Sequence, residues 1–240
     1  MKIFLDSSDI NEIRKWKDKV QGFTTNPTLM RKAGVTDYEA FCKEVLVEVG
    51  DKPVSFEVFA DDFEEMERQA KIISSWGDNV YVKIPVTNTR GEPSNELIRK
   101  LNRKGIKINI TAVCNYFPIQ FITLLVGYPK ELLTDKSIII SVFCGRIADT
   151  GRDPEWILRE VKSHVNQDSR LRNKNISYLW ASPREVFNIY QAEEAEADII
   201  TCTPELLTKY EKFKGMNLKQ LSLDTVKMFH QDAKEAGYKI

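Results

Sequence analysis

Short hydrophobic segments recur along the whole chain, and longer segments with helical periodicity separate them. In segment 80–86, Val or Ile occupies every second position, and a β-rich run of this length predicts a strand. Pro85 has no amide proton to donate, so we expect strand pairing to end near this residue. Other segments of the chain have a similar character. The predicted strands are residues 3–6, 22–27, 54–60, 80–86, 106–111, 138–144, 176–181 and 198–202.

The alternation of strands and helices predicts an α/β fold. Several strands are almost continuously apolar, which indicates parallel strands that are buried on both faces. Eight strand–helix units favour a single (β/α)8 TIM barrel over residues 1–240. The last part of the chain, at about 221–236, has the pattern of an amphipathic helix. On the pattern alone, an open doubly wound sheet remains the alternative.

Charge and composition exclude several classes of function. The 240 residues contain 35 Lys and Arg against 35 Asp and Glu, so the formal net charge is zero. This balance predicts no nucleic-acid partner and no membrane-surface partner. The first residues do not form a secretory signal, and no apolar run is long enough to span a bilayer. We therefore expect a cytoplasmic protein.

The cysteines and histidines narrow the chemistry further. The four cysteines lie far apart, which is typical of reduced thiols and does not indicate a disulfide or zinc framework. The two histidines lie in helical, charged segments that do not suit a Ser-His-Asp triad. The chain contains no nucleotide-binding or zinc-binding motif. We therefore expect neither a metal nor a cofactor.

Lys83 stands inside the apolar segment 80–86, near the C-terminal end of that predicted strand. Most lysines point to solvent, and this interpretation stays open for Lys83 taken alone. A lysine that is held out of water instead loses its proton more readily and becomes a nucleophile. In barrels of this kind, functional residues gather at the C-terminal ends of the strands. Lys83 is therefore a candidate for covalent chemistry.

Polar side chains also occur at or near the ends of other predicted strands. Each has an ordinary structural explanation alone, such as a helix cap for Asp6 or a pre-proline turn for Asn26. Together with Lys83 they form a coherent set of carboxylates, uncharged hydrogen-bonding groups and arginines. The set comprises Asp6, Asn26, Glu57, Asn109, Thr111, Ser141, Arg146, Ser182 and Arg184.

These residue types suit one kind of reaction. A buried lysine can attack a ketone and form a Schiff base, and nearby carboxylates can move the protons that this chemistry requires. Asn and Ser side chains suit sugar hydroxyls. Arginines, helped by backbone N–H groups at a helix start, suit a terminal phosphate. This chemistry requires neither a metal nor a cofactor.

The chain resembles the transaldolase family, which includes the fructose-6-phosphate aldolases. The matching motifs occur in family order from the beginning of the chain to about residue 202. They are Phe4-Leu5-Asp6-Ser7-Ser8, Thr24-Thr25-Asn26-Pro27-Thr28-Leu29, Val82-Lys83-Ile84-Pro85, Asn109-Ile110-Thr111-Ala112, Phe143-Cys144-Gly145-Arg146 and Ala181-Ser182-Pro183-Arg184.

The resemblance implies a class I mechanism that acts on sugar phosphates. Lys83 would be the nucleophile that holds a dihydroxyacetone unit. Asp6 would be the acid/base for the C4 hydroxyl, and Glu57 with Thr111 would hold the water used in Schiff-base formation and hydrolysis. The substrate-binding residues that the resemblance implies are Asn26, Asn109 and Ser141 for hydroxyls, and Arg146, Ser182 and Arg184 for the phosphate.

Within the family, Glu57, Asn109 and Phe143 resemble the transaldolase branch, so a transferase is favoured. One alternative is a lyase, either like fructose-6-phosphate aldolase or acting on another ketose. Another alternative is a sugar-phosphate-binding barrel without catalytic activity. Segments 88–93 and 125–136 look longer than the family pattern. They follow strands or helices that we expect to frame the pocket mouth, so they bear on acceptor preference. The resemblance also implies a homo-oligomer. The apolar positions of helix 221–236 predict that it packs either on its own barrel or on another subunit.

Overall fold

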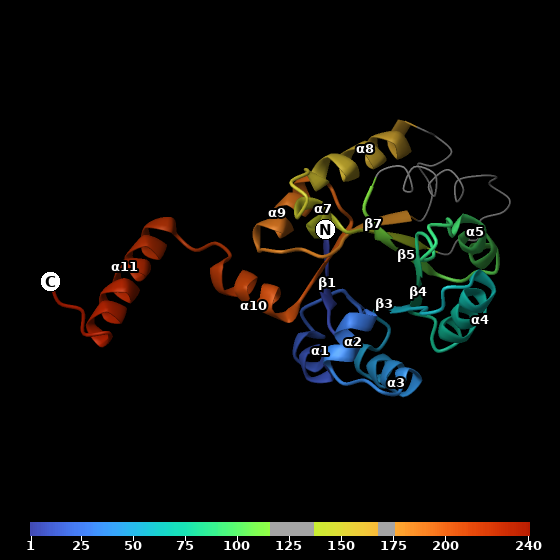
Figure 1. Ribbon diagram of the computed structural model, residues 1–240, viewed down its shortest axis with the longest axis horizontal. Helices are drawn as coiled ribbons and strands as arrows, with labels where there is room; N and C mark the ends of the chain where they lie inside the picture. Colours follow the sequence, from blue (N-terminus) through green and yellow to red (C-terminus); the bar gives the residue numbers. More distant parts are fainter. Residues whose placement is uncertain (116–136, 168–175) are drawn as a thin grey trace.

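The barrel predicted from the hydrophobic pattern is present. The computed structural model describes residues 1–115, 137–167 and 176–240 (Figure 1). Within these residues, eight parallel strands pair in chain order, and β8 pairs with β1 to close the barrel. This closure excludes the open doubly wound sheet. The strands are β1 (Lys2–Asp6), β2 (Gly22–Thr24), β3 (Val54–Glu57), β4 (Val80–Pro85), β5 (Ile108–Val113), β6 (Ile138–Val142), β7 (Ile176–Trp180) and β8 (Ile199–Cys202).

Helices connect the strands and cover the outside of the barrel (Figure 1). Several begin at the polar residue that the sequence places there: Asp9, Asp37, Asp62 and Thr203 each accept hydrogen bonds from backbone N–H groups of the first turn. The described helices are α1 (Ile10–Trp16), α2 (Pro27–Lys32), α3 (Tyr38–Val49), α4 (Phe63–Ser74), α5 (Asn95–Arg103), α7 (Cys144–Ala148), α8 (Pro154–Gln167), α9 (Phe187–Glu194), α10 (Pro204–Phe213) and α11 (Leu218–Glu235).

Strands β2, β3 and β6 end two or three residues earlier than predicted. Strand β2 stops at Thr24, because Asn26 caps a helix that the sequence pattern did not predict, α2, with Pro27 as its first residue. Strand β3 stops at Glu57, because the amides of Phe59 and Ala60, two and three residues further on, donate to the side-chain oxygen of Gln69 and turn the chain toward α4. Residue 144, predicted to end the sixth strand, begins α7 instead.

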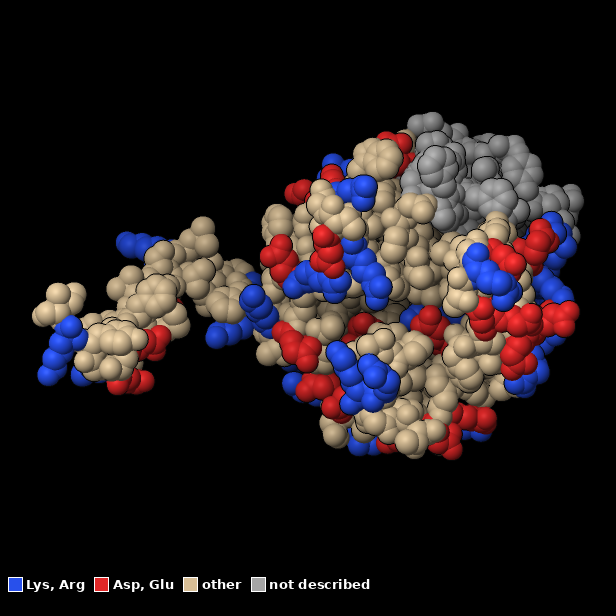
Figure 2. All heavy atoms as spheres, in the orientation of Figure 1, with Lys and Arg blue, Asp and Glu red and all other residues tan. Residues whose placement is uncertain are grey.

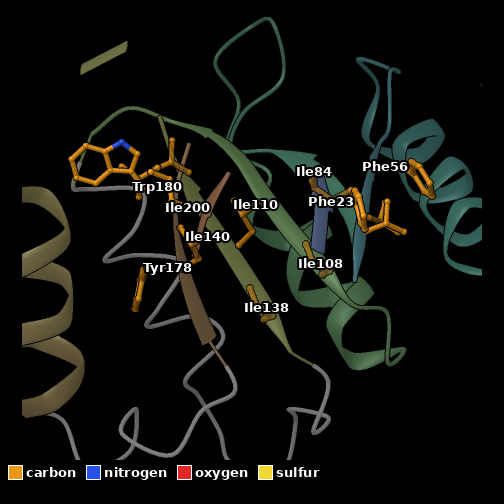
Figure 3. Close-up of a cluster of buried hydrophobic side chains, with 14 of the residues drawn as sticks. Phe23, Phe56, Ile84, Ile108, Ile110, Ile138, Ile140, Tyr178, Trp180 and Ile200 are labelled. Carbon is orange, nitrogen blue, oxygen red and sulfur yellow. The ribbon is translucent and has the colours of Figure 1, made fainter. Parts of the chain in front are cut away.

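Alternation along the strands separates two apolar clusters. Side chains that point outward from the barrel pack beneath the helices, and they include Phe23, Ile84, Ile110, Ile140 and Ile200 (Figure 3). Full burial of such a side chain contributes about 1.5–3 kcal/mol to stability. This outer cluster holds the helices on the sheet and fixes the register of the strands.

A second, smaller cluster fills the barrel interior toward the N-terminal ends of the strands. It contains Phe4, Ile139, Leu179 and Ile199, and Ala181, which also lines the cavity at the C-terminal end, packs on them. Gly22 is required beside it, because a Cβ atom there would lie 2.5 Å from the Phe4 ring. The inward positions nearer the C-terminal strand ends are polar instead. The barrel is therefore closed by apolar side chains at one end and carries polar groups at the other.

The C-terminal helix α11 stands away from the barrel, at the end of an arm that α10 begins (Figure 1). It covers Leu218–Glu235, close to the predicted 221–236, and none of its residues is buried. Of the two alternatives for this helix, packing on its own barrel is therefore not what the structure shows. Its apolar residues Leu223, Val226 and Phe229 are 47%, 63% and 62% exposed.

Charges of both signs are mixed on the molecular face seen in Figure 2. No block of one sign dominates the part of that face which the structure describes, as the equal numbers of acidic and basic residues predict. Among the described helices, none is both long and apolar enough to cross a membrane.

Candidate active site

A cavity of about 460 Å³ opens at the C-terminal end of the barrel strands. Because successive inward positions are two residues apart, polar residues from neighbouring strands converge on it. The predicted residues that line the cavity are Asp6, Asn26, Glu57, Lys83, Thr111, Ser141, Arg146 and Ser182. Asn109 and Arg184 do not line it.

Lys83 points into the barrel and is 6% exposed, so the solvent-facing interpretation is wrong. Its Nζ lies 2.9 Å from Oε2 of Glu57 and donates a hydrogen bond of 2.7 Å to the backbone oxygen of Thr25. The β3–β4 register pairs Glu57 directly with Lys83, which places the two side chains next to each other inside the barrel. A buried amine therefore has a carboxylate in direct contact.

Asp6 lies in the same cavity and belongs to a chain of hydroxyl groups. Thr24 Oγ1 donates a hydrogen bond of 2.9 Å to Oδ1 of Asp6, and it lies 2.5 Å from Oγ1 of Thr201. Burial raises the pKa of Asp6 above its ordinary value, although the positive charge of Lys83 and the hydrogen bonds from Thr24 and Asn26 lower it in part. Asp6 therefore takes up a proton more readily than an exposed aspartate.

Asn109 lies just below the cavity, and no part of it reaches solvent. Its side-chain nitrogen donates to Oγ of Ser55 at 3.0 Å, and its oxygen accepts from Oγ of Ser141 at 2.7 Å. A buried hydrogen-bond network of this kind fixes the orientation of its members. Ser141 lines the cavity, so Asn109 supports the site from beneath.

The loop after β7 packs tightly against α7. A Cβ atom on Gly145 would lie 1.6 Å from the backbone oxygen of Ser182, so only glycine allows this approach. Ser182 has a positive φ of 63°, which most side chains avoid. The packing brings Arg146 and Ser182 to the same side of the cavity, and the Arg146 guanidinium lies 5.4 Å from the centre of the Phe143 ring.

Arg184 is held outside the cavity by Asp149, the residue that follows α7 as its C-cap. Its Nη2 lies 2.5 Å from Oδ2 of Asp149, and its Nε donates to the same oxygen at 3.1 Å. Nε also donates to Oδ1 of Asp149 at 3.3 Å, and bonds from two guanidinium nitrogens to one carboxylate fix the guanidinium plane. Of the two predicted phosphate-binding arginines, the structure therefore brings Arg146 to the cavity and leaves Arg184 beside it.

The sequence analysis missed Thr24, Thr201 and Ser55. Thr24 and Thr201 line the cavity, and Ser55 anchors Asn109. A signal was present, because Thr24 and Thr201 face inward in register with Asp6 and Phe4 of β1.

Segment 88–93 is closed by a hydrogen bond between the backbone groups of Asn88 and Glu92 and does not line the cavity. Segment 125–136 lies outside the described residues. Among the residues described, no group of three His, Cys, Asp or Glu side chains could hold a metal.

Comparisons with known proteins agree on one family. A sequence model described as Transaldolase/Fructose-6-phosphate aldolase matches residues 3–240. A protein of Thermoplasma volcanium named "Probable transaldolase" is 37% identical over 221 residues, which cover 88% of this chain and 90% of that protein. Another protein with this name, from Dehalococcoides mccartyi, is 32% identical over 209 residues, which cover 86% of this chain and 88% of that protein.

Solved structures with low sequence identity share the fold. The 3-hexulose-6-phosphate synthase from Salmonella typhimurium superposes with a TM-score of 0.55 at 13% identity, covering 85% of this chain and 89% of that one. The orotidine 5'-monophosphate decarboxylase from Metallosphaera sedula gives a TM-score of 0.52 at 12% identity, covering 84% and 87%. At these identities the likeness concerns the barrel alone.

Proposed function

This chain belongs to the transaldolase/fructose-6-phosphate aldolase family, and from that membership we propose that it transfers a dihydroxyacetone unit between sugar phosphates through a Schiff base on Lys83. One observation carries the proposal: a buried lysine in contact with Glu57 shares a cavity with Asp6. An amine, an adjacent carboxylate and a separate proton acceptor are the groups that Schiff-base cleavage of a ketose requires.

Schiff-base formation uses Lys83 and Glu57. The ammonium of Lys83 gives its proton to Glu57, 2.9 Å away, and the neutral amine attacks the ketone carbon of the substrate. The resulting carbinolamine loses its hydroxyl as water when Glu57 returns the proton. Thr111, which lines the same cavity, supports this water by hydrogen bonding. Glu57 and Thr111 serve the hydrolysis of the Schiff base in the same way, in the reverse direction.

Carbon–carbon cleavage uses Asp6. The carboxylate takes the proton of the C4 hydroxyl, the C3–C4 bond breaks, and its electrons move into the iminium group on Lys83. The aldehyde product leaves, and the dihydroxyacetone unit stays attached as an enamine. When an acceptor aldehyde enters, the enamine attacks its carbonyl carbon, and Asp6 gives its proton to the carbonyl oxygen, which becomes the new hydroxyl. The raised pKa of Asp6 suits a group that must both take up and return a proton.

Binding of the substrate uses both ends of the polar cavity. Asn26 and Ser141 offer hydrogen bonds to the hydroxyls of the dihydroxyacetone unit, with Asn109 fixing Ser141 from below. Arg146 and Ser182 offer a positive charge and a hydroxyl group for the phosphate. Arg184 can bind the phosphate only if its ion pair with Asp149 breaks.

A product assay without an acceptor separates a transferase from a lyase. Phe143 lines the cavity without a hydroxyl group, at a position where the lyase branch of the family carries Tyr, and this favours the transferase. With fructose-6-phosphate alone, we expect release of glyceraldehyde-3-phosphate to stop after about one equivalent per site, and turnover to begin when an aldose phosphate is added. Continuous release of free dihydroxyacetone would identify a lyase instead.

Arg146→Ala tests the phosphate assignment. Loss of a charged hydrogen bond to phosphate costs about 1.5–3 kcal/mol, so we expect KM for fructose-6-phosphate to rise about 10- to 100-fold. Capture of unphosphorylated dihydroxyacetone should change little. Arg184→Ala is the matched control, because Asp149 already holds that guanidinium, and its effect on KM should be smaller. Equal KM values for phosphorylated and unphosphorylated ketoses in the natural protein would contradict the assignment.

We also propose that α11 mediates homo-oligomer formation. Its exposed apolar residues Leu223, Val226 and Phe229 have no partner on the barrel, and a second copy of the chain would cover them. Val226→Asp with Phe229→Asp should reduce the mass measured by light scattering, whereas Lys227→Ala with Lys234→Ala should not. An unchanged mass for the first pair would exclude α11 from the interface.

A cytoplasmic location is consistent with the state of the cysteines. Cys42, Cys144 and Cys202 are buried free thiols, and Cys114 is an exposed one. Free thiols persist in reducing compartments. We propose a cytoplasmic enzyme on this basis.

A further inference from the structure

Glu57 occupies a gap in the hydrogen bonding of the barrel. It is the last residue of β3. The neighbouring strand β2 is only three residues long and ends at Thr24. The last ladder bond from the β2 side joins Thr25 N–H to the oxygen of Ser55 at 3.2 Å. On the other side, the β3–β4 ladder continues with the amide of Val58 donating to the oxygen of Lys83 at 3.1 Å. Alternation of the ladder turns the amide and carbonyl of Glu57 itself toward β2, where no strand continues.

The hydroxyl of Tyr38 fills this gap. It donates a hydrogen bond of 2.7 Å to the backbone oxygen of Glu57, and it accepts one of 2.9 Å from the backbone N–H of the same residue. One side-chain oxygen thus takes the place of the missing strand residue. Without it, both backbone groups of Glu57 would lose their protein partner, and an unpaired buried polar group is costly.

Tyr38 lies in a partly buried aromatic cluster. Tyr38 is the first residue of α3, and its ring packs against Phe59 at a centroid distance of 5.3 Å and against Trp76 at 6.0 Å. Burial raises the pKa of the phenol above its ordinary value, and the Cys42 thiol lies close to it. The hydroxyl therefore keeps its proton at neutral pH and can donate and accept at the same time.

We infer that Tyr38 is a positioning residue for Glu57, because its hydroxyl fixes the peptide from which the carboxylate reaches Lys83. The inference rests on the proposed function. In the resting protein the carboxylate is also held by the ion pair with Lys83. Once Lys83 is bonded to substrate, that anchor changes, and the position of Glu57 depends on its backbone. Tyr38 then keeps the carboxylate beside the water that must be released and later used.

The test is the rate of Schiff-base capture in Tyr38→Phe. This variant keeps the ring and removes the hydroxyl. Displacement of a catalytic group by about 1 Å can reduce the rate as much as 100-fold, so we expect capture to slow by about 10- to 100-fold with KM changed less than about twofold. The rate is measured by stopping the reaction with borohydride at successive times. It is normalised to the final amount captured, so that only folded protein contributes.

Trp76→Phe is the matched control for stability. Trp76 belongs to the same aromatic cluster but forms no hydrogen bond to Glu57 in the described structure, so its capture rate should stay near that of the natural protein even if Tm falls. A loss of rate in Trp76→Phe equal to that in Tyr38→Phe would overturn the inference, because general loosening would then explain both.

A double-mutant cycle with Glu57→Gln identifies the group through which Tyr38 acts. If Tyr38 acts through Glu57, adding Tyr38→Phe to Glu57→Gln should reduce the rate by less than about twofold. If Tyr38→Phe instead slowed capture by the same factor in Glu57→Gln as in the natural protein, the inference would be overturned. The proposed function fails differently: Glu57→Gln alone would then capture substrate at the natural rate, or the natural protein would capture none.

Discussion

Lys83→Met should reduce transfer of the dihydroxyacetone unit by about 10⁴-fold or more. The side chain of Met has a similar length but no amine, so no Schiff base can form, and loss of a covalent nucleophile typically removes most of the rate enhancement. The variant should fold, because Met is apolar and the lysine position is 6% exposed. It also removes the buried charge in contact with Glu57, so a change of Tm should be measured beside the kinetics.

Lys107→Met is the matched control for this substitution. Lys107 lies just before β5, where its Nζ binds the backbone oxygen of Asp78 at 2.5 Å, and it does not line the cavity. The control should keep its kcat within about twofold, because only surface contacts change. Residual transfer in Lys83→Met above a few per cent of the natural rate would mean that another group carries the chemistry.

Asp6→Asn should separate cleavage from covalent capture. Because Asn cannot accept the C4 proton, kcat for transfer should fall by about 10²- to 10⁴-fold, the usual contribution of a general base. Capture of dihydroxyacetone on Lys83 involves no C–C bond, so borohydride should still trap that adduct. Loss of capture together with loss of cleavage would instead assign Asp6 to Schiff-base formation.

The pH dependence of transfer follows from the raised pKa of Asp6. The carboxylate must be ionised to take a proton, so kcat/KM should fall as pH decreases through this pKa. The acid limb should therefore lie above the ordinary aspartate value of about 3.9. Measurement of kcat/KM from pH 4 to pH 9 locates it. An acid limb at or below the ordinary value would assign the proton transfer to a different group.

The same pKa shift has a consequence for stability, with its own sign. Because the folded protein holds the Asp6 proton more tightly than the unfolded chain, ionisation of Asp6 costs stability above the folded-state pKa. This cost disappears as pH falls below the unfolded-state value. Asp6→Asn should therefore be more stable than the natural protein at pH 7, and the difference should shrink at low pH. Thermal unfolding at both pH values measures it.

Period-two alternation explains why much of the site could be predicted from sequence. Glu57, Lys83 and Asn109 lie at inward-facing positions of β3, β4 and β5. The strand register pairs Glu57 with Lys83, and Lys83 with Asn109. A barrel with parallel strands then requires their side chains to converge at one end. The group around Lys83 follows from these local facts, whereas closure of the sheet was favoured by the pattern and established by the pairing of β8 with β1.

Other features depend on packing between distant segments. Arg184 stands beside Ser182 in the sequence, but its guanidinium is held by Asp149, which α7 brings close only because residue 145 is Gly. Tyr38 appears in the sequence as an apolar position of a helix. Its bonds to Glu57 exist because β2 stops at Thr24, and the sequence pattern did not predict that early end.

The position of α11 also could not be predicted from the sequence pattern. Its amphipathic pattern predicts a helix, and a helix is present, but a pattern states only that an apolar face exists. Which surface covers that face depends on the relative position of α10 and the barrel, and this geometry is not encoded locally. The helix was therefore predictable, and its departure from the barrel was not.

The most direct test of the central proposal is intact mass after borohydride reduction in the presence of fructose-6-phosphate. The natural protein should gain the mass of one reduced dihydroxyacetone unit per chain, and fragmentation should place that unit on Lys83. Lys83→Met should gain none. A natural protein that gains no mass with fructose-6-phosphate, sedoheptulose-7-phosphate or dihydroxyacetone, or that gains it on another lysine, would contradict the Schiff-base assignment of Lys83.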